Sequence, residues 1–307
     1  MMREAITNSF SKARTFDGLI SEQQDLTFSV LESTLKKDLG IEKISEDVLI
    51  TLDLYKKSEG YTNAGALLAD KNQFRGIDMV RFGKNINIML DRANYEKISI
   101  LEQYNSAISK YRQYYQHEEI IGSNRKVVSQ IPEEAFREAI ANALVHRTWD
   151  VDSQTKVSMY DDKIEVTSPG GLPAGLSKEE YLNGQISILR NPIIANIFFR
   201  LGLIEQFGTG IIRIVDSYEN SLVKPQFHTY ENSISIVLPV KQISVDELSR
   251  EENEIYQVLD SGPLSTKEIV NDTSFGRTKA LQIINHLIEK GYLEKEGNGR
   301  ATKYSRK

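Results

Sequence analysis

The chain has 307 residues, of which 40% are hydrophobic and 26% charged, with a formal net charge of −5. This composition is ordinary for globular proteins, the length allows two or three domains, and the negative charge means that any nucleic-acid binding must come from a local basic patch. The sequence has no cysteine, which excludes a disulfide framework and a thiolate metal site. Its four histidines lack the spacing of zinc ligands, which argues against a zinc site. We expect a cytoplasmic protein with no membrane partner, because neither an apolar run of transmembrane length nor a signal peptide occurs.

The first elements along the chain are short. Residues 48–57 are expected to form a helix, and residues 62–69 a second, shorter helix. Residues 79–82 and 86–89 have the pattern of two strands of a hairpin.

A helical connector is expected over residues 91–117. Four tyrosines lie along this connector: Tyr104, Tyr111, Tyr114 and Tyr115. A tyrosine cluster at helical spacing more often serves packing or an oligomer contact than base stacking, so a homodimer is one expected assembly.

The most informative helix is expected from Pro132 to His146. Glu138, Asn142 and His146 recur every four residues, which places them on one face. A second face supplies the apolar stripe for a core, made of Phe136, Ile140 and Leu144.

Glu138 and Asn142 have the residue types that a metal-assisted phosphate site needs. Glu138 can orient or deprotonate a water, and the amide oxygen of Asn142 can ligate Mg²⁺, which accepts hard oxygen ligands. The alternative is an ordinary amphipathic helix on which Glu138 and His146 are merely exposed.

A β-hairpin is expected next, with strands at residues 155–159 and 164–166. It ends in Ser168-Pro169-Gly170-Gly171. Adjacent glycines after a strand let the backbone approach a flat ligand closely, or simply permit a turn.

Residues 173–207 are interrupted by helix breakers, which is typical of a mobile lid. Gly208-Thr209-Gly210 then leads into an apolar helix start, whose free backbone N–H groups suit a phosphate, although a plain loop-to-helix junction has the same pattern. A final strand is expected at residues 233–238.

The C-terminal residues predict a winged helix-turn-helix. A first helix lies around residues 255–259, a capping box at residues 265–268 opens a second, and a third is expected at residues 275–290. A hairpin with strands at residues 293–296 and 300–304 forms the wing.

The basic residues concentrate in this last part. From Phe275 to Lys307 there are eight basic and three acidic residues, which gives a local charge of +5. In a helix-turn-helix the start of the third helix enters the major groove of double-stranded DNA. The candidates for contacts with bases or phosphates are Ser274, Arg277, Thr278, Lys279, Arg300 and Lys303. A winged helix used only for protein pairing is the alternative.

The order of the central motifs resembles a known family. The helix with Glu138, Asn142 and His146, the hairpin ending in two glycines, Arg190-Asn191-Pro192 and Gly208-Thr209-Gly210 occur in sequence. Residues 111–240 are therefore similar to the divergent branch of GHKL ATPases found in prokaryotic transcriptional regulators and often labelled "RecG-like C-terminal".

The resemblance implies a GHKL-like α/β sandwich, with helices over one face of a mixed sheet, that binds ATP and Mg²⁺. Glu138 would match the catalytic carboxylate and Asn142 the Mg²⁺ ligand. Gly170 and Gly171 would match the first glycine box, and Gly208 and Gly210 the second. The other cofactor-binding candidates on these motifs are His146, Ser168, Arg190, Asn191 and Thr209.

One departure concerns adenine. The parent superfamily binds it through an Asp near the first glycine box, where this chain has Ser168, and a hydroxyl is a weaker acceptor than a carboxylate. A slow ATPase and a degenerate scaffold without nucleotide both stay open. Helicase activity is excluded, because the chain lacks the Gly-x-x-x-x-Gly-Lys-Ser/Thr loop of a P-loop motor.

Residues 9–90 resemble the second half of a Schlafen AlbA-like domain, whose first half is missing. The expected fold class is therefore α+β and multi-domain. It comprises a partial α/β Schlafen AlbA-like domain (1–92), a helical connector (93–125), the GHKL-like ATP-binding domain (126–243) and the winged helix-turn-helix (244–307). Together these features predict a DNA-binding transcriptional regulator with a nucleotide-binding sensor domain.

Overall fold

The computed structural model describes residues 15–121, 124–184, 188–205, 209–219, 221, 223–241, 248–297, 299 and 302–306. The chain divides into two compact units. The first unit is built from residues up to 117 and from 127–241, and the C-terminal unit from 118–126 and the residues after 241.

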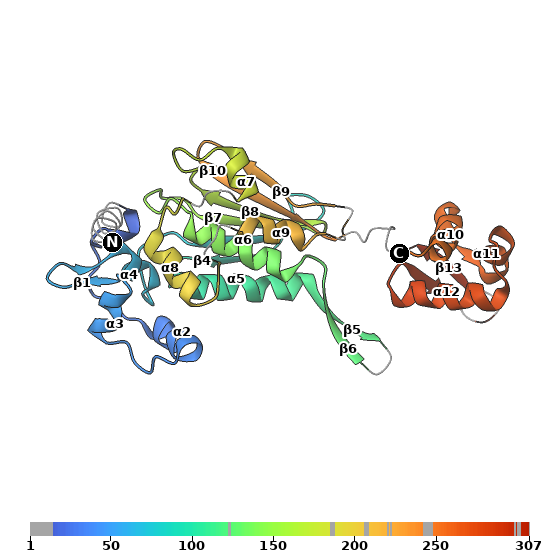
Figure 1. Cartoon of the computed structure of the whole chain (residues 1–307), viewed down its shortest axis with the longest axis horizontal. Helices are drawn as coiled ribbons and strands as arrows, with labels where there is room; N and C mark the ends of the chain where they lie inside the picture. The colour runs from blue at the N-terminus through green and yellow to red at the C-terminus, as the bar shows by residue number, and fades with distance from the viewer. Residues whose placement is uncertain are drawn as a thin grey trace. The chain divides into compact units, whose positions relative to one another are not determined.

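A six-stranded sheet organises the first unit (Figure 1). Its strand order is β4-β3-β7-β8-β10-β9. Strands β3 and β7 are parallel and the other neighbours antiparallel, so the sheet is mixed, as expected. The strands are β3 (Ile77–Phe82), β4 (Met89–Tyr95), β7 (Thr155–Met159), β8 (Lys163–Pro169), β9 (Gln226–Thr229) and β10 (Ser233–Pro239).

Helices cover one face of this sheet. Along β7 and β8 the side chains of Val157, Ile164 and Val166 are buried, while their neighbours in sequence point to the other face. The helices α5 (Ile100–Tyr115), α6 (Glu133–Val145) and α9 (Gly210–Asp216) lie over the buried face (Figure 1). Phe136 of α6 stacks on Tyr111 of α5 with 4.7 Å between ring centroids, so the predicted apolar stripe of α6 belongs to the core.

The N-terminal elements differ in part from the expectation. The helix expected over residues 48–57 ends early: α3 spans Glu46–Thr51, and β1 (Tyr55–Lys56) pairs with β2 (Gly60–Tyr61). Asp53 has a φ of 58°, a left-handed conformation that Asp tolerates better than most residues and that terminates the helix. Two further short helices are α2 (Ser29–Leu39) and α4 (Asn63–Leu68).

The second strand of the first hairpin lies further along the chain than expected. Strand β4 spans Met89–Tyr95, with Ala93 opposite Met79, so the expectation of a strand at residues 86–89 was wrong. Long-range pairing decided this register over the local alternation of Ile86 and Ile88, which are exposed. The helical connector accordingly begins only at α5, and the sheet crosses residue 92, where a domain boundary was expected.

Two elements that follow α5 in the sequence were not expected. Strands β5 (Gln116–Ile121) and β6 (Asn124–Ser129) form a two-stranded sheet where a connector was predicted. The division into four domains at residues 92, 125 and 243 stays a prediction.

The segment expected to be a lid contains two helices. α7 (Lys178–Asn183) starts with a capping box from Ser177 and Glu180. α8 (Pro192–Arg200) has no cap from its own N-cap side chain; instead the buried Asp17, in the 3₁₀ turn Phe16–Gly18, accepts hydrogen bonds from the N–H groups of Ile193 (2.7 Å) and Ile194 (3.2 Å). A carboxylate at a helix N-terminus is favourable, so Asp17 anchors this helix from the start of the chain.

In its described residues the C-terminal unit contains three α-helices and a three-stranded antiparallel sheet of order β11-β13-β12. Ile255, Ile269 and Ile284, one from each helix, form its core. The elements are α10 (Arg250–Val258), β11 (Leu264–Ser265), α11 (Thr266–Asp272), α12 (Arg277–Glu289), β12 (Leu293–Glu296) and β13 (Lys303–Arg306). The last strand starts three residues later than expected, and β11 was not predicted.

Candidate functional site

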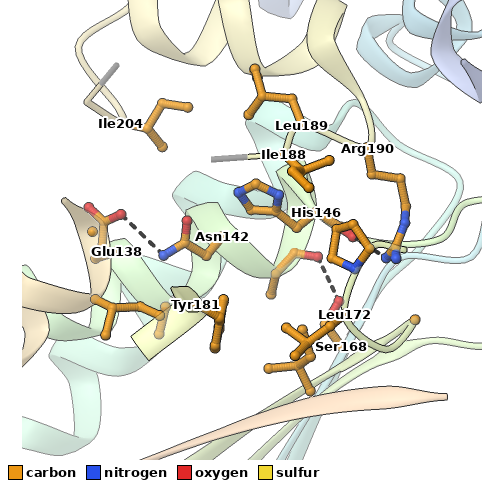
Figure 2. Close-up of a pocket in the computed structure, with 18 of the residues that line it drawn as sticks. Glu138, Asn142, His146, Ser168, Leu172, Tyr181, Ile188, Leu189, Arg190 and Ile204 are labelled. Atoms are coloured by element: carbon orange, nitrogen blue, oxygen red, sulfur yellow. Dashed lines mark hydrogen bonds between the residues drawn. The ribbon is translucent and has the colours of Figure 1, made fainter. Parts of the chain in front are cut away.

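A cavity in the first unit lies between α6, the end of β8, and the helices α7, α8 and α9 (Figure 2). Its walls are largely apolar. The polar side chains among them come from α6, from the end of β8, and from the segment that carries α7 and α8, which contributes Arg190, Asn196 and Glu205. Concave, mostly apolar sites with a few convergent polar groups are typical of small-molecule binding.

Glu138 and Asn142 form a hydrogen-bonded pair in this cavity. The Asn142 side-chain nitrogen donates to Glu138 Oε1 at 3.2 Å, and the Glu138 residue is only 7% exposed. Burial raises the pKa of the Glu138 carboxyl, against the opposing effects of the Arg213 charge and the Asn142 hydrogen bond. Arg213 itself pairs with Glu205 at 2.5 Å, so no described cation contacts Glu138 directly.

The Asn142 side-chain oxygen points toward the cavity (Figure 2), and no described group donates a hydrogen bond to it. Together with the Glu138 carboxylate it offers the hard oxygen atoms that Mg²⁺ prefers, and Mg²⁺ commonly keeps several waters and takes its other ligands from phosphates. Among the described residues no group of three or more His, Cys, Asp or Glu has the arrangement of a metal site. The residues therefore fit a metal that arrives with a phosphate ligand.

The first turn of α9 closes over this pair. A Cβ atom on Gly210 would lie 2.0 Å from Glu138 Oε1 and 3.1 Å from the Asn142 side-chain nitrogen. Only glycine permits this approach without moving the carboxylate. The glycine thus brings backbone of the second glycine box against the acid and amide of α6.

The turn after β8 forms another wall. Ser168 donates its hydroxyl hydrogen to the Ala143 carbonyl of α6 at 2.9 Å, which leaves its oxygen free to accept a bond from a ligand. A Cβ on Gly171 would lie 2.2 Å from the Glu231 carbonyl, and Gly170 has a φ of +103°. Gly171 is therefore required by backbone packing and Gly170 by its left-handed backbone conformation, whatever ligand they contact.

Arg190 holds this turn against the end of α6. Its guanidinium donates to the carbonyls of His146 at 2.7 Å and Gly171 at 2.9 Å. Burial, reinforced by the Arg190 charge, lowers the pKa of His146 to about 4, so the imidazole is neutral near pH 7. The His146 ring faces the cavity (Figure 2).

Asn191 has a different position from the one that its motif implies. It is fully buried, and its amide nitrogen donates to the carbonyls of Val145 and Arg147, both at 2.8 Å. These contacts secure the C-terminal end of α6, and neither Asn191 nor Thr209 is among the residues that line the cavity.

The structure therefore brings most of the sequence-based candidates together. Those lining the cavity are Glu138, Asn142, His146, Ser168, Gly170, Gly171, Arg190 and Gly210. Gly208 lies outside the described residues. The apolar wall, to which Leu172, Tyr181 and Phe199 contribute, was not predicted, because apolar residues in a lid carry no distinctive motif.

The candidates in the C-terminal unit lie on its surface. Ser274, Arg277, Thr278, Lys279 and Lys303 are exposed, and Arg300 lies outside the described residues. Lys279 forms an ion pair with Glu251 of α10, and the Ser274 N–H donates to Glu254 at 2.7 Å. Arg277 and Lys303 form no ion pair within the described part of the chain.

Comparison with known proteins places the central domain. Residues 152–238 match the model of the family described as "Putative ATP-dependent DNA helicase recG C-terminal". Over this region, which includes the turn after β8 and the start of α9, the chain is therefore similar to an ATPase-like domain family. The match begins after α6, the helix that carries Glu138 and Asn142.

A solved structure shares the fold. The crystal structure of the DIP2311 protein from Corynebacterium diphtheriae superposes with a TM-score of 0.67 at 19% sequence identity. The alignment covers 97% of this chain but 66% of that one, so this chain spans about two thirds of the length of its structural relative. No curated protein matches the sequence. Among the described residues, no helix is long and apolar enough to cross a membrane.

Proposed function

We propose that the chain is a DNA-binding transcriptional regulator whose ATPase-like domain binds a nucleotide, ATP, together with Mg²⁺. The supporting observation is that Glu138 and Asn142 of α6 line the same cavity as the turn after β8 and Gly210 of α9. Three segments far apart in sequence thus offer a carboxylate, an amide oxygen and close backbone to one ligand.

Each group has a role in this proposal. The Ser168 oxygen accepts a hydrogen bond from the adenine amine, and the apolar walls enclose the base. Asn142 would hold Mg²⁺ that arrives with the phosphates, and the N–H groups at the start of α9 would contact those phosphates. Glu138, when ionised, orients the attacking water; its raised pKa makes it a better proton acceptor than an exposed glutamate.

DNA binding is assigned to the C-terminal unit. Helix α11, a turn and helix α12 are followed by the strands β12 and β13, which is the element order of a winged helix-turn-helix. The exposed Arg277 and Lys303 supply phosphate contacts. We propose that a nucleotide contacting the lid segment favours one of its arrangements and thereby changes the affinity for DNA.

Thermal unfolding with ATP and Mg²⁺ tests the nucleotide site, because a ligand that binds only the folded state stabilises it. The expected result is a rise in Tm at millimolar nucleotide, a changed affinity for double-stranded DNA, and slow phosphate release that Glu138→Gln abolishes while the rise in Tm persists. Glu134→Gln, on the exposed face of the same helix, is the matched control. Unchanged Tm and DNA affinity with nucleotide would refute the sensor, and phosphate release that survives Glu138→Gln would refute the catalytic role.

A second candidate is an interaction scaffold that has lost nucleotide binding. The observation in its favour is that Arg190, the one described cationic side chain lining the cavity, is committed to the carbonyls of His146 and Gly171. A triphosphate would then receive its positive charge from Mg²⁺ alone. Equilibrium dialysis with ATP and Mg²⁺ decides between the two, since the scaffold retains no nucleotide.

A further inference from the structure

Helix α12 has an outward face made of uncharged hydrogen-bonding side chains. Thr278, Gln282 and Asn285 are all exposed and are spaced by four and three residues, so they form one stripe. The opposite face carries the buried side chains Ala280, Ile283, Ile284 and Leu287. No acidic residue occurs between Asp272 and Glu289.

Beside this stripe, other side chains of α12 contact acidic residues of α10. Lys279 pairs with Glu251, and both His286 (2.9 Å) and Lys290 (2.8 Å) contact Glu252. These ion pairs attach α12 to α10. The described residues provide no hydrogen-bond partner for the side chains of Gln282 and Asn285, so neither amide contributes to holding the unit together.

Asn285 is also a poor choice for a helix interior. Asparagine has a lower helix propensity than alanine or lysine, because its short amide competes for backbone hydrogen bonds in non-helical conformations. An exposed mid-helix position imposes no packing requirement. The amide at this position therefore weakens the helix without any compensating contact within the unit.

The chemistry of two exposed amides on one helix face fits a particular ligand. In the major groove adenine presents the acceptor N7 beside the donor N6, and the side chain of Asn or Gln pairs with both at once. We infer that Gln282 and Asn285 read adenine bases in the major groove of double-stranded DNA. The inference rests on the proposed DNA-binding function and adds the base that is read and the residues that read it.

Two positively charged side chains near the stripe of Thr278, Gln282 and Asn285 also suit double-stranded DNA. Arg277 starts α12, and Lys303 lies on β13, both exposed and without an ion-pair partner in the described part of the unit. Cations at the edges of a neutral amide stripe suit a ligand with charged phosphates outside and uncharged base edges inside. An acidic protein surface would satisfy Arg277 and Lys303 but leave both amides without a specific role.

The experiment uses the full-length chain and a random pool of DNA duplexes. Duplexes retained after rounds of selection are expected to share adenines at fixed positions. Fluorescence anisotropy at several salt concentrations then compares a selected duplex with a scrambled one. Gln282→Ala and Asn285→Ala are each expected to reduce the preference for the selected duplex by roughly 5- to 150-fold, the range for one bidentate base contact.

Chemical substitution in the DNA isolates the contact. Replacing a selected adenine by 7-deazaadenine removes the N7 acceptor, so binding by the unmodified chain should weaken at the position that each amide reads. The matching variant, having lost that contact already, should show no further loss. Asn105→Ala, on the exposed face of α5 in the first unit, is the matched control and should change nothing.

Two further readouts separate base reading from other roles. Asn285→Ala should leave the slope of log affinity against log salt unchanged and should keep or raise the Tm, since alanine favours the helix. Arg277→Ala should weaken binding to all duplexes about equally and reduce that slope by about 1.

The two levels of the proposal fail differently. Binding of duplex DNA with no adenine preference, or a preference that survives both amide variants, overturns the adenine reading and leaves DNA binding in place. If no duplex binds at low salt, both DNA binding and adenine reading are overturned. Both are also overturned if an acidic protein binds at α12 in competition with DNA.

Discussion

Among the described residues, each unit buries one glutamate to a similar degree, yet the pKa values of the two carboxyl groups are shifted in opposite directions. Glu138 in the first unit is 7% exposed and Glu252 in the C-terminal unit 5%. Burial raises the pKa of Glu138. Burial also acts on Glu252, but hydrogen bonds from Lys290 and Ser249 outweigh it and lower its pKa to about 2.

The difference lies in the partners. Glu252 accepts hydrogen bonds from Lys290 (2.8 Å) and from the N–H group of Ser249 (2.7 Å). The bond with Ser249 is part of the capping box at the start of α10. Glu138 has the Asn142 amide and no cation in contact. A buried carboxylate whose charge is compensated serves structure, whereas one left uncompensated in a cavity is a candidate for ligand binding or catalysis.

The largest effect on stability is expected in the cavity wall that the turn after β8 forms. Gly171→Ala places a Cβ 2.2 Å from the Glu231 carbonyl, a backbone atom that cannot rotate away. We expect a loss of about 1–3 kcal/mol in the free energy of unfolding, the usual range for overpacking, and loss of any nucleotide response. Gly276→Ala is the control, because no atom lies within 4 Å of its added Cβ. Urea unfolding measures both, and equal values for the two variants would contradict the packing argument.

The structural glutamate is tested by removing its charge. Glu252→Gln should destabilise the C-terminal unit by about 1–2 kcal/mol near pH 7, because hydrogen bonds to a charged group are stronger than those to an amide. The pKa of Glu252 is lowered in the folded state, so its contribution is complete above about pH 4.5 and disappears as the pH falls toward 2. The stability difference between the two proteins should therefore shrink over that window. A difference that stays constant from pH 7 to 2, measured by circular dichroism, would contradict this assignment.

The smallest effect is expected for the candidate site. Glu138→Gln removes a charge that burial already disfavours and retains the shape of the side chain, so the free energy of unfolding should stay within about 0.5 kcal/mol or increase. Calorimetry of Glu138→Gln and Glu252→Gln under the same conditions compares the stability that each charge contributes. A loss as large as that of Glu252→Gln would mean that Glu138 is structural too.

The elements that sequence predicted well are those with local causes. The helix from residue 133, the hairpin of β7 and β8, and the capping box at Ser265 and Glu268 all depend on residues a few positions apart. The elements predicted wrongly depend on distant partners: the register of β4 is determined by β3, and the early end of α3 by a turn that leads into the β1–β2 pairing.

The candidate site shows the same division. The spacing of Glu138 and Asn142 on one helix face, and the order of the glycine turns, could be read from the chain because helical periodicity and turn chemistry are local. Only the fold decided the roles of three other residues. Arg190 donates to backbone carbonyls, Asn191 donates to the end of α6 and does not line the cavity, and Asp17 anchors α8 across more than 170 residues. Burial and hydrogen-bond partners are properties of neighbours in space, and the sequence order of these neighbours carries no signal of their contact.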